Sequence, residues 1–229
     1  MTWIWSNLDL IWDRTFDHLI LSVPSIILSF LIALPFGWLA HRYRASRAVI
    51  LTTVGLLYAI PSLPLFIVLP FIVGTSIRSP LNLIIALTLY GVALMVRVVA
   101  DGLGSVDRDV QQSATAVGFS GWTSFWQVEL PLAGPVLLAG LRVVAVSTVS
   151  LATVGAVIGA QSLGSLFTDG FQRGIQAEII AGILATVLLA LALDAVLVLI
   201  GRLLMPWTRR SAIGVVARPG AVARQEVTT

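Results

Sequence analysis

Five stretches of this chain carry few or no charges, and their length limits the fold more than any other feature of the sequence. The stretch 19–40 consists of 22 consecutive residues without a charged side chain. About 20 apolar residues are enough to cross the roughly 30 Å hydrocarbon core of a bilayer as an α-helix. Comparable stretches predict four further spans at 48–73, 81–100, 133–160 and 178–203. With 58% hydrophobic and only 11% charged residues, the chain is expected to be an all-α polytopic membrane protein with about five transmembrane helices, or six.

The second of these stretches contains three prolines, Pro61, Pro64 and Pro70. A proline inside a helix removes one backbone hydrogen bond, and its ring clashes with the preceding turn. A single span here therefore requires a kink or an unwound segment around the residues IPSLP, with the freed backbone groups satisfied by neighbours. Two shorter half-helices are the alternative.

The residue types that the chain lacks exclude several kinds of chemistry. There is no cysteine, so disulfides are excluded, and the two histidines, His18 and His41, lie at opposite ends of one apolar run and predict no metal cluster. All 14 basic residues are arginine, whereas the phosphate-binding motif GxxxxGK, followed by serine or threonine, needs a lysine. We therefore expect no cofactor in this chain, and any ATP and Mg²⁺ on a partner subunit. Because the arginines are scattered singly beside apolar runs, nucleic acid is not an expected partner.

The distribution of arginine predicts the orientation of the spans. If the five spans alternate, three arginines fall on one side of the membrane and ten on the other. Cytoplasmic loops of membrane proteins carry the excess of basic residues. The sequence thus predicts an outward-facing N-terminal segment at 1–18 and a cytoplasmic loop at 101–131. It also predicts a cytoplasmic tail at 206–229, which is expected to be disordered because it has no apolar periodicity.

The loop at 101–131 has the signals of two short helices joined by a tight turn. Asp107 is placed to cap a helix through DRDVQQSATAV, and Gly118 suits the left-handed turn that commonly ends a helix. Ser120 is placed to cap a second helix, which Pro131 is expected to end. Positions i, i+3 and i+4 of that helix form an apolar stripe of Trp122, Phe125 and Trp126. The stripe is suited either to burial against another surface or to an interfacial hairpin that lies on lipid headgroups, since both have this pattern.

The spacing of residues in this loop resembles the cytoplasmic coupling loop of ABC importer permeases. That pattern is written EAA, three residues, G, nine residues, I, any residue, LP. Here Gln112, Ser113 and Ala114 are followed after three residues by Gly118, and after nine more by Val128-Glu129-Leu130-Pro131. Glutamine stands in place of the usual glutamate at 112 and serine in place of alanine at 113. A charge-assisted contact to a partner is therefore weakened or replaced by an amide hydrogen bond.

The resemblance extends over residues 16–205. The segments that carry it are YAIPSLPLF at 58–66, LYGVALMVRVVADGLGSVD at 89–107, LPLAGPVLLAGLR at 130–142 and IGAQSLGSLFTDG at 158–170. They are similar to the permeases for glycine betaine, choline and related osmoprotectants. This similarity implies a type I ABC importer permease fold with a cytoplasmic pair of coupling helices. It also implies a transport subunit, not an enzyme, in the inner or plasma membrane of a prokaryotic cell.

The same resemblance implies partners and roles for individual residues. The expected partners are an ABC ATPase dimer, a second permease copy or a related permease chain, an extracytoplasmic substrate-binding protein and membrane lipid. The residues expected to couple the chain to the ATPase are Gln112, Ser113, Ala114, Gly118, Trp122, Leu130 and Pro131. The expected substrate is a quaternary amine of the glycine betaine, choline, carnitine or proline betaine type.

Five residues are candidates for the translocation pathway: Tyr58, Ser62, Tyr90, Arg142 and Asp194. Charged residues inside spans do not face lipid alone, so Arg142 and Asp194, at matching depths in the fourth and fifth spans, are expected to pair. A purely structural pair, and core packing for the tyrosines, are the alternatives to a pathway role. The rival function is an ion-coupled secondary transporter or channel in which this pair relays ions. The matched coupling loop favours the ATPase-driven importer.

Overall fold

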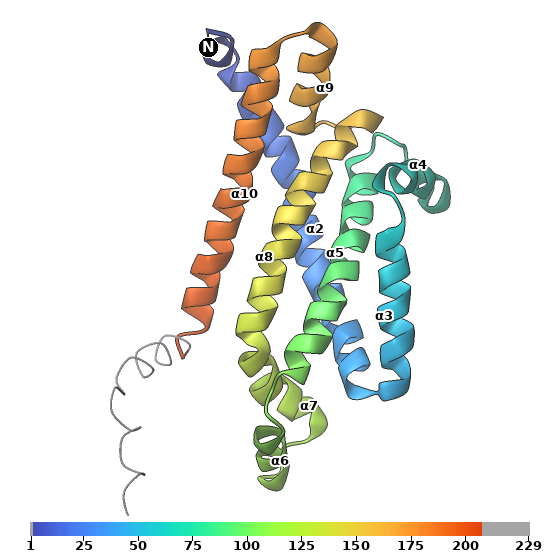
Figure 1. Cartoon of the computed structure of the whole chain (residues 1–229), viewed down its shortest axis with the longest axis vertical. Helices are drawn as coiled ribbons and strands as arrows, with labels where there is room; N and C mark the ends of the chain where they lie inside the picture. Colours follow the sequence, from blue (N-terminus) through green and yellow to red (C-terminus); the bar gives the residue numbers. More distant parts are fainter. Residues whose placement is uncertain (1, 208–229) are drawn as a thin grey trace, which may run out of the picture.

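The computed structural model describes residues 2–207, and every regular element within them is a helix. Four helices run along the long axis of the molecule (Figure 1): α2 (Leu8–Arg42), α5 (Pro80–Gly104), α8 (Leu130–Val154) and α10 (Gln176–Leu204). Each of the four is long and apolar enough to cross a membrane, α8 when the helical turns on either side of it are included. The prediction of an all-α polytopic membrane protein is confirmed.

Helix α5 lies at the centre of the bundle, packed against both α2 and α8. Apolar residues occupy nearly its whole circumference, which is typical of a helix buried on all sides. Its fully buried side chains include Leu83, Leu87, Met95, Val96, Val99 and Leu103. By contrast, α10 leaves most of its apolar side chains exposed and forms an edge of the bundle.

The second predicted span is broken into two helices. Helices α3 (Arg44–Ala59) and α4 (Ser62–Val73) meet at an angle of 105°, so α4 lies across the bundle while α3 runs along it (Figure 1). Ile60 and Pro61 between them have extended backbone conformations. Pro61 and Pro64 lack the N–H groups that would continue α3. Of the two alternatives for residues 48–73, the structure has the pair of shorter helices.

The first helix is longer than the span at 19–40. Helix α1 (Thr2–Ser6) and the start of α2 include most of the segment 1–18 that was expected to precede it. Charged residues limit which part of a helix crosses a bilayer but not where the helix begins, and Asp9 in the first turn of α2 favours a helix N-terminus.

A further short helix, α9 (Gly164–Arg173), lies between α8 and α10 at the end of the bundle where α2 begins (Figure 1). Of the predicted tail, residues 208–229 lie outside the described residues.

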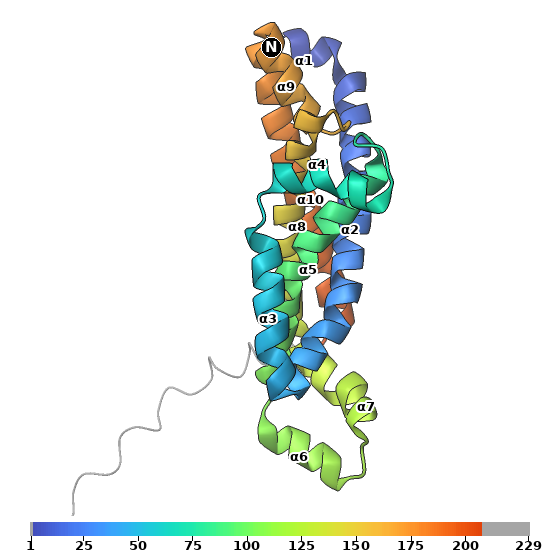
Figure 2. The same cartoon turned by 90° about the vertical axis from the view of Figure 1, so that its right-hand side faces the viewer.

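The polar loop forms the other end of the bundle. Helices α6 (Arg108–Ala116) and α7 (Gly121–Ser124) lie beyond the ends of the long helices (Figure 2). A π-helix, Phe125–Glu129, follows α7 and leads directly into α8. We refer to this end as the loop end and to the opposite one as the α9 end.

Candidate functional site

Both helix caps predicted in the loop are present. The side chain of Asp107 accepts a hydrogen bond from the backbone N–H of Asp109 at 2.9 Å, and the Ser120 hydroxyl accepts one from the N–H of Thr123 at 3.2 Å. Gly118 lies between the two helices with a φ of +99°, a conformation that L side chains rarely adopt. Local sequence rules therefore set the turn that separates α6 from α7.

The prediction that Pro131 ends the second helix is wrong. The chain continues from α7 through the π-helix into α8, and Pro131 lies in the first turn of α8. In a regular α-helix its ring would clash with the carbonyl of Gln127, four residues earlier. A π-turn is wider and bonds an N–H to the fifth preceding carbonyl, as the N–H of Leu130 does with Phe125. The wider turn accommodates the proline, so the loop joins a membrane span without a linker.

The aromatic stripe consists of one buried anchor and two exposed rings. Phe125 is 4% exposed and packs edge-on against Trp38 of α2, with ring centroids 6.1 Å apart. Trp122 and Trp126 are 65% and 46% exposed, and their centroids lie 6.2 and 5.0 Å from that of Phe125. Two indoles held against a buried ring form a surface suited to protein contact, because aromatic anchors dominate protein interfaces.

The seven residues that the resemblance predicts to couple the chain to an ATPase fall into two groups. Four are exposed on the loop surface: Gln112, Ser113, Gly118 and Trp122. Three are buried or half-buried where the loop packs on itself and joins α8: Ala114, Leu130 and Pro131. The first group is accessible on the surface of the loop, whereas the second packs within it.

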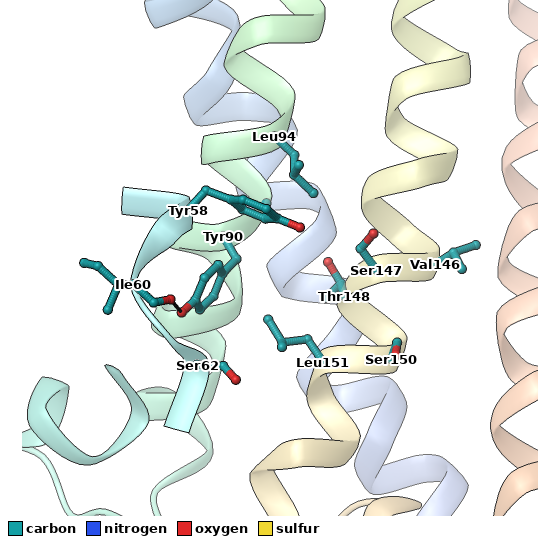
Figure 3. A pocket seen from close by; sticks show the side chains of 11 residues that line it. Tyr58, Ile60, Ser62, Tyr90, Leu94, Val146, Ser147, Thr148, Ser150 and Leu151 are labelled. Atoms are coloured by element: carbon teal, nitrogen blue, oxygen red, sulfur yellow. Dashed lines mark hydrogen bonds between the residues drawn. The ribbon is translucent and has the colours of Figure 1, made fainter. Parts of the chain in front are cut away.

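A cavity of about 570 Å³ lies beside the bend between α3 and α4 (Figure 3). Three of the five pathway candidates line it, namely Tyr58, Ser62 and Tyr90. The rings of Tyr58 and Tyr90 meet edge to face, with centroids 6.0 Å apart and planes at 81°. The structure thus brings side chains of α3, α4 and α5 around one space, which we call the tyrosine cavity.

The break between α3 and α4 explains the position of Tyr90. In a continuous helix the carbonyl of Ile60 would accept from the N–H of residue 64, but Pro64 has none. The hydroxyl of Tyr90 donates to this carbonyl instead. An unpaired backbone group at membrane depth is unfavourable by several kcal/mol, so this hydrogen bond stabilises the bend while it orients the tyrosine.

The opposite wall of the tyrosine cavity carries three hydroxyl side chains beside the apolar Val146 and Leu151, and none of these residues was among the predicted ones. Ser147, Thr148 and Ser150 of α8 line it, and Figure 3 shows Ser147 and Thr148 across the cavity from the two tyrosines. Their signal in the sequence is the cluster STVS at 147–150 within an apolar span. Because hydroxyl groups in helices commonly bond their own backbone, the cluster alone does not indicate a cavity.

The charged pair lies on the side of α8 that faces α10. Arg142 of α8 donates from Nε and Nη2 to the two carboxylate oxygens of Asp194 of α10, at 2.6 and 2.7 Å. The predicted pairing is confirmed. Neither residue lines the tyrosine cavity, so the five pathway candidates do not meet in one place.

A family model matches residues 33–210, a stretch that contains the loop, the tyrosine cavity and the charged pair. The model describes a binding-protein-dependent transport system inner membrane component. The chain belongs to this family. It is therefore a membrane permease subunit, as the coupling-loop spacing indicated.

Known relatives of the permease are similar over most of their length. The glycine betaine/carnitine/choline transport system permease protein OpuCB of Bacillus subtilis is 27% identical over 206 residues, which cover 90% of this permease and 94% of that protein. The osmoprotectant import permease protein OsmW of Salmonella typhimurium is 32% identical over 183 residues, with coverages of 79% and 85%. The alignment with each relative therefore includes nearly a whole permease.

Solved structures of ABC importers share the fold of this permease. A chain of the inward-facing methionine transporter MetNI superimposes with a TM-score of 0.75 at 24% identity and covers 86% of this permease and 97% of that chain. A chain of an amino acid ABC transporter gives a TM-score of 0.68 at 14% identity, with coverages of 89% and 96%. The type I ABC importer permease fold that the loop motif implied is confirmed.

Proposed function

We propose that the permease forms the membrane pathway of an ABC importer for an osmoprotectant of the quaternary amine type, such as glycine betaine, choline, carnitine or proline betaine. The two relatives described above are named for such solutes or for osmoprotectants in general. In this proposal a separate ATPase dimer binds ATP and Mg²⁺ and supplies the energy. The permease itself catalyses no reaction.

The tyrosine cavity carries the proposal. A quaternary ammonium has no N–H donor and is attracted to the faces of aromatic rings, within about 6 Å of the ring centroid. Tyr58 and Tyr90 supply two rings at 81° to each other, and Ser147 and Thr148 on the opposite wall supply hydroxyl groups for a carboxylate or hydroxyl of the solute. The volume of about 570 Å³ lies within the roughly 300 to 1,000 Å³ of small-ligand pockets.

The charged pair favours a structural role over an ion relay. Arg142 and Asp194 satisfy each other through two short hydrogen bonds. A relay requires ionisable groups that face the pathway or a water-filled space, whereas this pair joins α8 to α10 outside the tyrosine cavity. The ion-coupled transporter therefore gains no support from the pair.

The loop end is cytoplasmic in this proposal, and the N-terminus and the α9 end face outward from the cell membrane. The division of arginines, ten against three, supports this orientation. Gln112, Ser113 and Trp122 then contact the ATPase, and the unbroken helix from α7 into α8 transmits its movement to the membrane spans. An extracytoplasmic binding protein delivers the solute at the α9 end, and a second permease chain, identical or related, completes the importer.

Reconstitution of the permease with its ATPase and binding protein in liposomes tests the proposal. We expect ATP-dependent uptake of radiolabelled glycine betaine, and a reduction of about tenfold or more in Tyr58→Leu, because a desolvated cation–π contact contributes about 2 kcal/mol. Tyr43→Leu is the matched control, since Tyr43 is exposed between α2 and α3 and does not line the cavity. Uptake driven by an ion gradient without the ATPase, or equal uptake in the two variants, contradicts the proposal.

A further inference from the structure

Glu178 is a buried acidic residue that lies beside a second acidic residue, Asp169. It lies in the first turn of α10 at the α9 end and is 1% exposed. Neither of its carboxylate oxygens has a hydrogen-bond partner within residues 2–207. The carboxyl group of Asp169 lies close enough to interact with that of Glu178, and Asp169 is itself paired with Arg173 at 2.9 Å. A buried carboxylate is strongly unfavourable unless it is protonated or paired with a cation, so a positive charge in the adjoining space would stabilise the charged form of Glu178.

Glu178 lines a cavity of about 380 Å³ that is bounded by α2, α9, α10 and the segment between α8 and α9. This volume also lies within the roughly 300 to 1,000 Å³ of small-ligand pockets. The polar and charged residues of its wall also include Arg14 of α2, Asp169 and Gln172 of α9, and Gln161. None of its lining residues lines the tyrosine cavity. We call this second space the α9 cavity.

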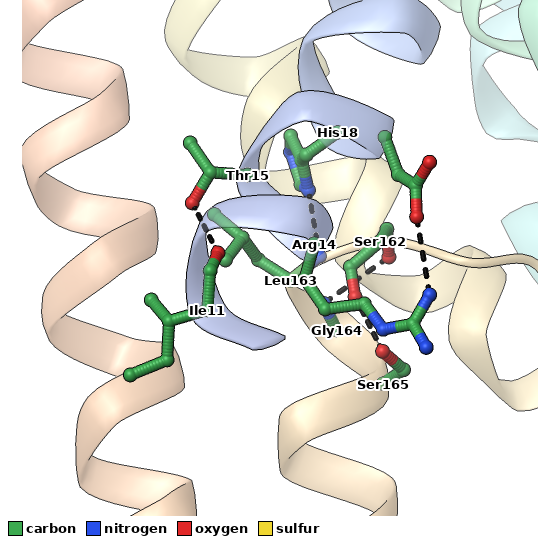
Figure 4. A network of polar contacts seen from close by, with 9 residues as sticks. Ile11, Arg14, Thr15, His18, Ser162, Leu163, Gly164 and Ser165 are labelled. Carbon is green, nitrogen blue, oxygen red and sulfur yellow. Dashed lines mark hydrogen bonds and ion pairs between the residues drawn. The ribbon is translucent and has the colours of Figure 1, made fainter. Parts of the chain in front are cut away.

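Arg14 has donors that its own contacts do not use. Its side chain extends past Ser165 at the start of α9 (Figure 4). Within residues 2–207 it makes one hydrogen bond, from Nη1 to the carboxylate of Asp17 at 3.1 Å. A guanidinium presents five N–H donors in a planar fork. Arg14 is therefore able to bind a second carboxylate while it keeps the first.

The start of α9, which forms part of the wall of the α9 cavity, is held by a buried histidine (Figure 4). Nδ1 of His18 accepts a hydrogen bond from the N–H of Leu163 at 3.3 Å, which leaves Nε2 to donate to the carbonyl of Val149 at 3.0 Å. The hydroxyl of Ser162 accepts from the N–H of Gly164 at 3.1 Å. These contacts tie α9 to α2 and α8. A site that is formed in advance loses less entropy when a ligand binds.

We propose that the α9 cavity is a second solute site, which binds a small zwitterion with its substituted ammonium at Glu178 and its carboxylate at Arg14. The proposal goes beyond the proposed function because it places a recognition site at the end of the bundle opposite the coupling loop. It rests on the proposed function for the class of solute. Glycine betaine and carnitine carry both charged groups, whereas choline carries the ammonium alone. The α9 cavity therefore distinguishes the zwitterions from choline through Arg14.

Equilibrium binding to the permease–ATPase complex in lipid nanodiscs, without the binding protein, tests this site. All variants carry Tyr58→Leu, so that the tyrosine cavity contributes little. We expect radiolabelled glycine betaine to bind, and Glu178→Gln and Arg14→Gln each to weaken its binding about tenfold or more, because each removes one charged partner and leaves a charge of the solute unpaired. Radiolabelled choline binding is expected to weaken in Glu178→Gln and to stay unchanged in Arg14→Gln.

Three results overturn the second site. The first is that glycine betaine does not bind. The second is that glycine betaine binds equally with and without Glu178→Gln, which is expected if Glu178 is a protonated, neutral part of the wall. The third is an equal loss of glycine betaine and choline in Arg14→Gln, which would assign Arg14 to the fold and not to the carboxylate. Retained choline binding in Arg14→Gln shows that this variant is folded.

Uptake by the complete importer in liposomes, with Tyr58 in place and with Glu178→Gln or Arg14→Gln as the only change, separates this inference from the proposed function. ATP-dependent uptake of glycine betaine together with unchanged binding in both variants removes the α9 site and leaves the importer intact. Uptake of neither glycine betaine nor choline by the complete importer contradicts the proposed function itself.

Discussion

Arg142 and Asp194 join the two neighbouring spans α8 and α10 through a bidentate contact, with Nε–Oδ1 and Nη2–Oδ2 distances of 2.6 and 2.7 Å. Parallel N–H···O bonds between a guanidinium and a carboxylate are among the strongest polar contacts in proteins, and their geometry is specific. In an apolar bundle each charge depends on the other, because neither has an alternative partner in lipid. The edge helix α10 is therefore held to the bundle by charge as well as by apolar packing.

Arg142→Leu and Asp194→Leu are each expected to lower the amount of folded permease in the membrane several-fold, since each leaves one charge unpaired. The double variant should be less impaired than either single variant. The measurement is the amount of folded permease recovered from membranes. Arg47→Leu is the control, because it breaks an exposed surface pair with Asp101, and such pairs contribute little. Strictly additive losses would show that the two charges do not depend on each other.

Gly118→Leu is expected to uncouple ATP hydrolysis from uptake without preventing assembly. A Cβ at Gly118 would meet no atom within 4 Å, so the effect comes from the φ of +99° and not from a clash. Gly118→Asn should retain more uptake, because asparagine adopts positive φ more readily than other L residues. ATPase activity and uptake are measured in the same liposomes. Normal uptake by an assembled Gly118→Leu permease would separate this turn from coupling.

Cysteine labelling tests the orientation of the permease, and the chain has no native cysteine to interfere. Trp126→Cys at the loop end should react with an impermeant maleimide only when the cytoplasmic side is accessible. Asp13→Cys at the α9 end should react in intact cells. Both positions are exposed in the structure. The reverse pattern would place the coupling loop outside the cell and contradict the proposed function.

Gly91→Ala is expected to destabilise the permease by about 1 to 3 kcal/mol, the usual effect of overpacking a tight interface. A Cβ at Gly91 would lie 2.0 Å from the hydroxyl of Ser29 and 2.7 Å from its Cβ, so α2 and α5 would have to separate. Ser29→Gly in the same chain should restore part of the stability. Gly55→Ala is the control, because a Cβ there meets nothing within 4 Å. Thermal unfolding in detergent reports the differences, and equal melting of Gly91→Ala and Gly55→Ala would refute the close contact.

Local rules are sufficient for a large part of this fold and of the loop proposed to couple it to the ATPase. The approximate positions of the long spans follow from apolar length alone. Asp107, Gly118 and Ser120 follow from capping and turn chemistry, which depends on residues within a few positions of each other. The pairing of Arg142 with Asp194 follows from two opposite charges at one depth, since few partners are available inside a bilayer.

Packing between helices decides the rest. A proline ends, bends or continues a helix according to whether neighbouring groups satisfy the backbone around it. The carbonyl freed by Pro64 is satisfied by Tyr90, which is 30 residues from its acceptor Ile60, and Pro131 remains in a helix because the turn before it widens. An apolar pattern shows which side chains avoid water but not which helix covers them. The tyrosine cavity and the burial of Glu178 therefore exist only after distant segments of the chain have packed together.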